Sequence, residues 1–176
     1  MENWAYEPEA LALFARHYQT GASMPKELID KLNLASTYMA GWMSLRQLSF
    51  GFLDLAWHGQ DPSDVQDIEA FERSHVERAL FFPPVAGTAM STSFTHIFSG
   101  GYSAGYYSYK WAEVLDADAF EFFKEKGIFS RDVATAFRQH VLSKGGSEHP
   151  MELYKRFRGR EPDPKALLRR DGLISD

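Results

Sequence analysis

Three tyrosines, a histidine and a pair of glycines stand close together in the middle of this chain. Tyr102, Tyr106 and Tyr109 are separated by four and three residues, so on an α-helix their side chains share one face. The preceding pair, Gly100–Gly101, allows backbone conformations with positive φ and a close approach by another backbone. His96 adds an imidazole beside them. This pattern predicts a site where neutral hydroxyl groups donate hydrogen bonds to a bound molecule.

A tyrosine stripe at helical spacing is also typical of core packing, with each hydroxyl bonded at the edge of the core. A second stripe is available for that purpose in the same segment. It consists of Tyr107, Trp111 and either Val114 or Leu115, on the opposite side of the predicted helix. If this second stripe packs inward, the three tyrosines point elsewhere and form a binding face.

The elements that must position these residues are all predicted to be helices, so we expect an all-α helical bundle formed by one domain, residues 1–176. No period-2 strand pattern occurs. Proline and cap signals place the helix starts and glycines most of the ends. Three helices have a predicted start and end; they cover 25–58 without a break, Ser63 to about Leu80, and 103–126. Four others are predicted by their first residues, which are Pro8, Ser130, Pro150 and Pro164. Residues 83–100 are expected to be a loop, either functional or a simple connection over the core.

Composition excludes several classes of protein. The net charge of −5 and the sequence pI of about 5.7 argue against a nucleic-acid partner. The absence of cysteine excludes disulfides and thiolate metal sites. The N-terminus lacks the pattern of a signal peptide, and no apolar run reaches the length of a membrane span. We therefore expect a cytoplasmic protein without a membrane partner.

The remaining titratable residues indicate no catalytic or metal site. No H-E-x-x-H occurs, and no two histidines have the i, i+4 spacing of a helical metal clamp. We expect the other histidines to lie at the surface; they are His17, His58, His75, His140 and His149. Two pairs of acids are expected to be ordinary solvated helix charges, namely Asp116 with Asp118 and Glu72 with Glu77.

Several segments, in order along almost the whole chain, resemble one family of zinc metallopeptidases. They are Glu2-Asn-Trp4, 45–54, 100–114, 127–129, 145–148 and 155–162. The chain is similar to the C-terminal part of the thimet oligopeptidase, oligopeptidase A and dipeptidyl carboxypeptidase family, and its last segments look most like oligopeptidase A. The resemblance implies the C-terminal portion of a larger, mostly helical, zincin-like enzyme.

The resemblance also implies roles for individual residues. His96, Gly100–Gly101, Tyr102 and Tyr106 fall where that family binds its peptide substrate. Tyr109 falls where a phenol stabilises the oxyanion as zinc-bound water attacks the peptide carbonyl. The zinc ligands and the general base of the family lie before the point where this sequence starts. No zinc ligand and no cofactor are therefore expected on this chain alone.

Two functions remain open. In the first, the chain is part of a zinc-dependent oligopeptidase that hydrolyses short peptides; it supplies the tyrosine and histidine wall of the cleft and is inactive alone. Its expected partner is the missing N-terminal part of the enzyme or a second copy of itself. In the second, it is a non-catalytic helical module that binds peptides or other proteins. Met1 resembles a methionine deep inside the family's sequences, so a truncated gene, a mis-assigned start or an excised domain would each explain this N-terminus.

Overall fold

The computed structural model describes residues 2–175, and every regular element in this range is helical, with one isolated β-bridge between Arg16 and Ser23. The predicted all-α class is therefore confirmed. Among the described residues, no helix combines the length and the apolar character needed to cross a membrane. Contacts divide the chain into two compact units, called the terminal unit and the central unit. The prediction of a single domain over 1–176 stays a prediction.

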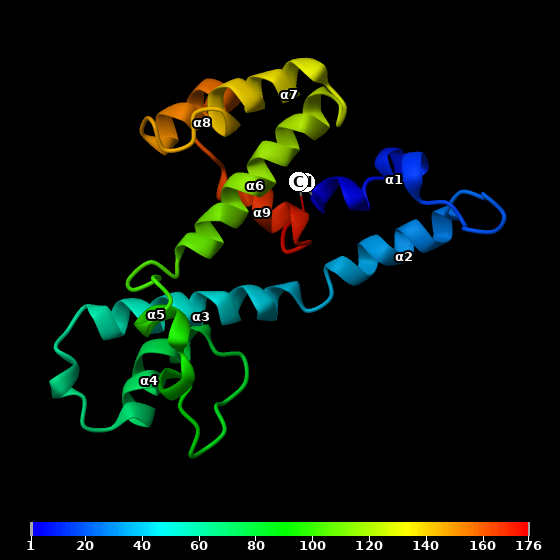
Figure 1. Cartoon of the computed structure of the whole chain (residues 1–176). Coiled ribbons are helices and arrows are strands. Elements are labelled where there is room, and N and C mark those ends of the chain that lie inside the picture. Colours follow the sequence, from blue (N-terminus) through cyan, green and yellow to red (C-terminus); the bar gives the residue numbers. More distant parts are fainter. Residues whose placement is uncertain (1, 176) are drawn as a thin grey trace. The chain divides into compact units, whose positions relative to one another are not determined.

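The terminal unit contains the residues through Tyr38 and those from Val114 onward. Its elements are η1 (Glu2–Tyr6), α1 (Pro8–Phe14), α2 (Lys26–Ser36), the larger part of α6 (Ser108–Lys126), α7 (Arg131–Phe137), a π-helical turn η5 (Arg138–Leu142), α8 (Pro150–Arg158) and α9 (Pro164–Arg170) (Figure 1). The predicted starts are confirmed at Pro8, Pro150 and Pro164, which lie in the first turns of α1, α8 and α9.

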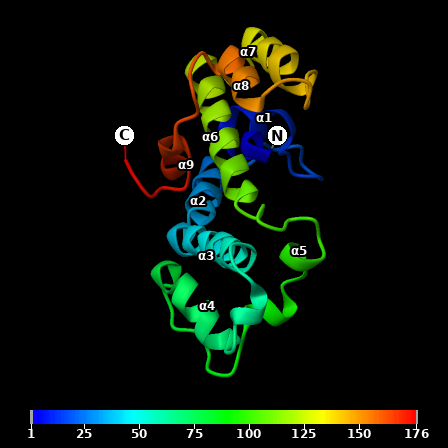
Figure 2. The ribbon, with the colours of Figure 1, turned by 90° about the vertical axis from the view of Figure 1, so that its left-hand side faces the viewer.

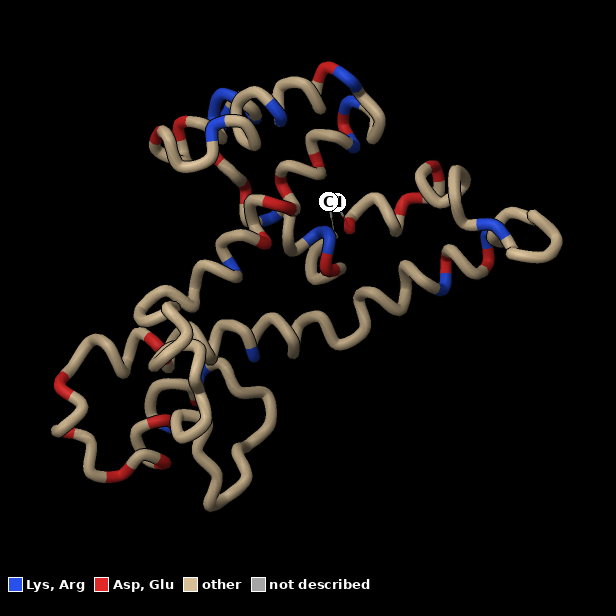
Figure 3. The backbone as a smooth tube through the Cα atoms, in the orientation of Figure 1, with Lys and Arg blue, Asp and Glu red and all other residues tan. Residues whose placement is uncertain are grey.

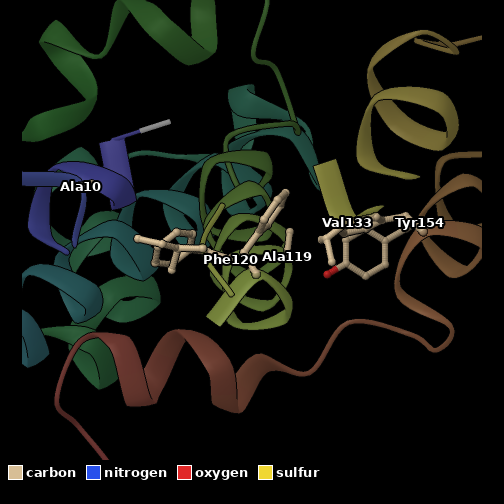
Figure 4. Close-up of a cluster of buried hydrophobic side chains, with 8 residues drawn as sticks. Ala10, Ala119, Phe120, Val133 and Tyr154 are labelled. Atoms are coloured by element: carbon tan, nitrogen blue, oxygen red, sulfur yellow. The ribbon is translucent and has the colours of Figure 1, made fainter. Parts of the chain in front are cut away.

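The core of the terminal unit is aromatic and centres on α6. Phe120 and Phe123 both meet the ring of Trp4, with centroids 4.6 Å and 5.0 Å away in edge-on arrangements. The indole nitrogen of Trp4 donates a 2.8 Å hydrogen bond to the carbonyl of Ile128. Figure 4 shows Phe120 with other members of this cluster, which also includes Ala10, Ala119, Val133, Tyr154 and Phe157.

Asp118 on α6 is fully buried, so the prediction that it is a solvated helix charge is wrong. The Tyr154 hydroxyl donates to one carboxylate oxygen, and Arg160 donates to the other at 2.7 Å. The Arg158 guanidinium lies 3.4 Å away. Burial, followed by the hydrogen bond to Asp118, raises the pKa of Tyr154 above its ordinary value. By contrast, Asp116 is exposed as predicted.

The central unit comprises Met39–Glu113. It contains α3 (Ala40–His58), η2 (Pro62–Asp64), α4 (Ile68–Val76), η3 (Glu77–Ala79), η4 (Met90–Ser93), α5 (Thr95–Phe98) and the start of α6. Helix α4 packs beside α3, as two directions of view show (Figures 1 and 2). The packing is aromatic, with the rings of Trp57 and Phe71 only 4.4 Å apart. Leu53, Phe94 and Ile97 form the buried core of this unit.

The unbroken helix predicted over 25–58 is wrong. Helix α2 ends at Ser36, and α3 begins at Ala40 after Met39, which has a left-handed backbone with φ of 57°. No proline marks this break, the nearest glycine is Gly41 in the first turn of α3, and the apolar period continues across it. The usual sequence signals for a helix end are therefore missing, although the break coincides with the boundary between the two units.

Two other predicted boundaries also differ. The helix expected from Ser63 starts instead at Ile68, because the Asp67 carboxylate accepts a 2.9 Å hydrogen bond from the backbone N–H of Ala70. The loop expected over 83–100 contains two short helical elements, η4 and α5. Between these elements, Phe94 is buried in the core of the central unit.

Asp118→Ala should destabilise the terminal unit by about 3–5 kcal/mol, because it removes the acceptor of the Tyr154 hydroxyl and the buried negative charge that pairs with Arg158 and Arg160. Urea unfolding of the full chain measures the change. The matched control is Asp116→Ala, two residues earlier on α6, which removes an exposed pair with Arg170 at 2.7 Å. Its cost should stay at or below about 1 kcal/mol. Equal losses of unfolding free energy for the two variants would contradict the role of Asp118 as a buried, paired carboxylate.

Candidate functional site

The predicted site lies within a long segment that carries no charge. From Ala79 to Tyr109 the sequence has no aspartate, glutamate, lysine or arginine. Figure 3 shows this part of the backbone as an unbroken tan trace in the central unit. Hydrogen bonding from this segment therefore depends on phenol, imidazole, alcohol and backbone groups.

The three tyrosines come together, but not in the way that their spacing predicts. Helix α6 begins only at Ser108, so Tyr102 and Tyr106 lie in the preceding turn, and the predicted helix start near 103 is wrong. The rings of Tyr102 and Tyr109 are nevertheless stacked with centroids 5.2 Å apart, and the ring of Tyr106 lies 5.0 Å from that of Tyr109. His96 lies 6.0 Å from Tyr102 and 6.1 Å from Tyr106, measured between ring centroids. We call these four residues the ring cluster.

The second apolar stripe does not pack as expected. Tyr107 is 57% exposed and Trp111 is 43% exposed, whereas Val114 is buried in the terminal unit. The argument that one stripe fills the core and so frees the other is therefore wrong. The ring cluster rests instead on contacts among its own members and on the packing of Tyr106 against the core of the central unit.

The glycine pair is required by the backbone beside the ring cluster. Gly101 has a φ of +81°, which residues with a side chain rarely adopt. A Cβ atom at Gly100 would lie 2.9 Å from the Cα and the carbonyl oxygen of His96. The backbone N–H of Tyr102 also donates a 3.2 Å hydrogen bond to the carbonyl of His96. The glycines thus let the chain fold back tightly against the histidine.

A residue outside the predicted site fixes the turn that carries the tyrosines. The carboxylate of Asp54 on α3 is fully buried and accepts hydrogen bonds from the backbone N–H groups of Ala104, at 2.9 Å, and Tyr106, at 2.8 Å. His58 Nδ1 lies 2.9 Å from the same carboxylate. Sequence reasoning missed this role for Asp54 and placed His58 at the surface, whereas the His58 side chain is only 26% exposed beside Asp54. The available signal was an acid between two leucines on a mostly apolar helix, four residues before a histidine.

Glu72 holds the earlier part of the same uncharged segment, so the prediction that it is a solvated charge is also wrong. Its side chain is only 9% exposed and accepts hydrogen bonds from the backbone N–H groups of Met90, at 2.9 Å, and Ser91. The Ser91 hydroxyl in turn accepts a 2.7 Å hydrogen bond from the indole of Trp57. These contacts order the second half of the predicted loop.

The ring cluster presents neutral donors to solvent. Tyr102 and Tyr109 are 37% and 39% exposed, whereas Tyr106 is half-buried, with its hydroxyl 3.4 Å from the amide oxygen of Gln47. A hydrogen bond with Tyr102 raises the pKa of Tyr109, and burial raises that of Tyr106 against the opposing charge of Arg46. The Tyr106 and Tyr109 hydroxyls therefore keep their protons at neutral pH and can act as hydrogen-bond donors.

Within residues 2–175, no three histidine or acidic side chains gather in a group that could hold a metal ion. The sequence also lacks H-E-x-x-H. The site as described can bind through hydrogen bonds and aromatic contact, and it offers donors to a carbonyl or an oxyanion. That the chain alone binds no zinc stays a prediction.

Comparison with known proteins decides the family. The profile of Peptidase family M3 matches residues 1–173. The chain belongs to peptidase family M3. Among its M3 relatives, oligopeptidase A of Escherichia coli is 48% identical over 98% of this chain, and the organellar oligopeptidase A of Arabidopsis thaliana is 43% identical over 99%. The dipeptidyl carboxypeptidase of Escherichia coli is 39% identical over 98%.

The resemblance drawn from the sequence motifs is confirmed at the level of the M3 family. The chain spans only about a quarter of the length of these relatives, 26% of the Escherichia coli oligopeptidase A and 23% of the Arabidopsis protein. Relationship to M3 peptidases is therefore established, whereas the roles of the single site residues stay predictions.

Tyr102→Phe should lower the pKa of the Tyr109 hydroxyl toward its ordinary value, because it removes the Tyr102 oxygen that accepts a hydrogen bond from Tyr109, the largest cause of the increase. The ring-carbon NMR signals of labelled tyrosines, followed through alkaline pH, measure this change. Tyr107→Phe is the control, since Tyr107 lies outside the ring cluster and should leave Tyr109 unaltered. An unchanged Tyr109 titration in Tyr102→Phe would show that the two hydroxyls do not interact.

Proposed function

We propose that this chain is the C-terminal helical part of a zinc-dependent M3 oligopeptidase, where it forms the tyrosine and histidine wall of the peptide cleft. The observation that carries the proposal is the ring cluster. Three neutral phenols and an imidazole converge from a tight glycine turn, α5 and α6, with two of the phenols more than one-third exposed. Identity of 48% to an oligopeptidase A over almost the whole chain supports this assignment.

The chemistry of the ring cluster suits the backbone of a short peptide. A peptide presents carbonyl acceptors at regular intervals, and neutral phenols donate to carbonyls without requiring a charged substrate side chain. His96 and Tyr102 would hold substrate backbone beside Gly100–Gly101, and Tyr106 would line the same wall. The uncharged character of the segment from Ala79 to Tyr109 agrees with recognition of backbone groups.

Tyr109 is the residue that we assign to the reaction itself. When bound in the longer enzyme, zinc would act as a Lewis acid and activate water. Tyr109 would donate a hydrogen bond to the negative charge that develops on the substrate carbonyl oxygen. Its raised pKa keeps the donor proton in place. The zinc ligands and the general base belong to sequence outside this chain, which contains no H-E-x-x-H.

The same proposal includes the setting in which the chain works. It would act in the cytoplasm on short peptides, as one helical domain paired with the N-terminal part of the enzyme, and would self-associate when that part is missing. Exposed apolar side chains in both units support such pairing, among them Leu13, Phe14, Tyr18, Phe81 and Val85. The alternative, a non-catalytic peptide-binding module, is favoured only by the lack of a metal-binding group among residues 2–175.

The purified chain should hydrolyse no peptide and should bind zinc neither tightly nor stoichiometrically, because tight binding needs a convergent set of ligands. An internally quenched fluorescent pentapeptide and calorimetric titration with zinc chloride measure the two properties. Peptide hydrolysis that a chelator abolishes would contradict the proposal that the chain is inactive alone.

Tyr109→Phe should lower kcat by about 10²–10³ in an enzyme that contains this chain, because it removes one donor to the oxyanion. A suitable enzyme is a chimera in which the chain replaces the matching quarter of Escherichia coli oligopeptidase A. Hydrolysis of the same quenched pentapeptide gives kcat and KM.

Tyr107→Phe is the matched control. It also removes a phenol hydroxyl, but from Tyr107, which lies two residues before Tyr109 and is 57% exposed. It should leave kcat within about twofold, as expected for a surface change away from the site. An inactive chimera that nevertheless binds the pentapeptide would favour the non-catalytic module. Equal kcat for Tyr109→Phe and the unmodified chimera would refute the role of Tyr109.

A further inference from the structure

We propose that Asp54 is a positioning residue for the substrate-binding tyrosines: it holds the turn 103–106 in the conformation that brings Tyr102, Tyr106 and Tyr109 together. This inference rests on the proposed function of the ring cluster, and it assigns a role to a residue that contacts none of the reacting groups. The observation behind it is the pair of backbone hydrogen bonds from Ala104 and Tyr106 to one buried carboxylate.

The two N–H groups need this acceptor because of where the turn lies. They precede α6, whose first residue is Ser108, and neither donates to a backbone carbonyl within that helix. Ala104 has a φ of 54°, a left-handed conformation that costs an alanine roughly 1 kcal/mol or more. This conformation aims the N–H groups of Ala104 and Tyr106 at a single point. A carboxylate meets both, one oxygen for each group.

The hydrogen bonds to Asp54 connect the tyrosine turn to helix α3. Within the segment, the Ser103 hydroxyl donates to the carbonyl of Ile97 at 2.6 Å, and the Tyr102 N–H donates to the carbonyl of His96. These bonds join the turn only to its own neighbours in the sequence. Asp54 joins it to α3, about 50 residues earlier, and Asp54 is fully buried.

The position of the Tyr106 ring follows from this connection. The ring packs edge-on against Phe50 of α3 at 5.7 Å and against Phe94 at 5.2 Å, while its backbone N–H bonds to Asp54. Tyr106 therefore keeps a fixed place beside Tyr109. His58 Nδ1, one helical turn after Asp54, is hydrogen-bonded to the backbone carbonyl of Asp54 at 2.9 Å and lies 2.9 Å from one of its carboxylate oxygens. Loss of the carboxylate would leave the ring contacts but free the turn to shift.

The test is a double-mutant cycle in the oligopeptidase chimera, with the quenched pentapeptide as the substrate. Asp54→Asn keeps one acceptor oxygen and should lower kcat/KM by about 10- to 100-fold, since a displacement of about 1 Å at a catalytic donor costs on that order. In the Tyr109→Phe background the same change should cost several-fold less, because Asp54 acts through the tyrosines.

Glu72→Gln is the matched control. Glu72 is a second buried carboxylate of the central unit that accepts two backbone N–H groups, but it holds Met90 and Ser91 instead of the tyrosine turn. Glu72→Gln should change kcat/KM by the same factor in the unmodified chimera and in the Tyr109→Phe chimera. If Asp54→Asn also gives equal effects in both backgrounds, Asp54 is only a general stabiliser and the proposal is overturned.

A second measurement separates this proposal from the proposed function. In the unmodified 176-residue chain, Asp54→Asn should shift the NMR signals of Tyr102, Tyr106 and Tyr109 and leave those of Tyr154, in the terminal unit, in place. Unshifted tyrosine signals overturn the positioning role. Shifted signals together with a Tyr109→Phe chimera of unchanged kcat support the role in positioning and refute the catalytic function instead. If Asp54→Asn does not fold, Asp54→Glu, which keeps the charge but moves the carboxylate, enters both experiments in its place.

Discussion

Buried carboxylates that accept backbone N–H groups are the interaction on which the central unit depends. The segment from Ala79 to Tyr109 has no charged side chain, and much of it lies outside regular helix. Its N–H groups need acceptors when water is excluded. Asp54 on α3 and Glu72 on α4 supply them at two places along the segment. Because Trp57 and Phe71 pack α3 against α4, both carboxylates are presented from one rigid pair of helices.

The sequence predicted the features that neighbouring residues determine, such as helix starts. Prolines and short polar caps mark several helix starts, so Pro8, Pro150, Pro164 and the cap at Ser130 were found correctly. The grouping of the three tyrosines was also predicted, although the reason given was helical register. The actual cause is a turn before Ser108 that returns Tyr102 onto Tyr109, and no period in the sequence describes it.

What the sequence did not predict depends on distant contacts. A carboxylate on a helix has the same local pattern whether it is solvated or buried, and its environment is decided by residues elsewhere in the chain. Asp54 meets Ala104, Glu72 meets Met90, and Asp118 meets Tyr154. The helix break at Met39 belongs to the same class, because the residues on either side give no local reason for a left-handed methionine between α2 and α3. Family membership, by contrast, followed from ordered motifs along the whole chain and needed no knowledge of these contacts.

The left-handed backbone at Ala104 limits which residues can replace this alanine. Glycine, asparagine and aspartate adopt such a conformation at low cost, whereas a β-branched residue such as valine or threonine would clash with its own backbone there. A single-base change converts any alanine codon to a valine, threonine or glycine codon, and two of the four alanine codons to an aspartate codon. At position 104, therefore, the backbone conformation limits which residues can replace alanine, although the side chain is exposed. Hydropathy and burial do not explain this limit.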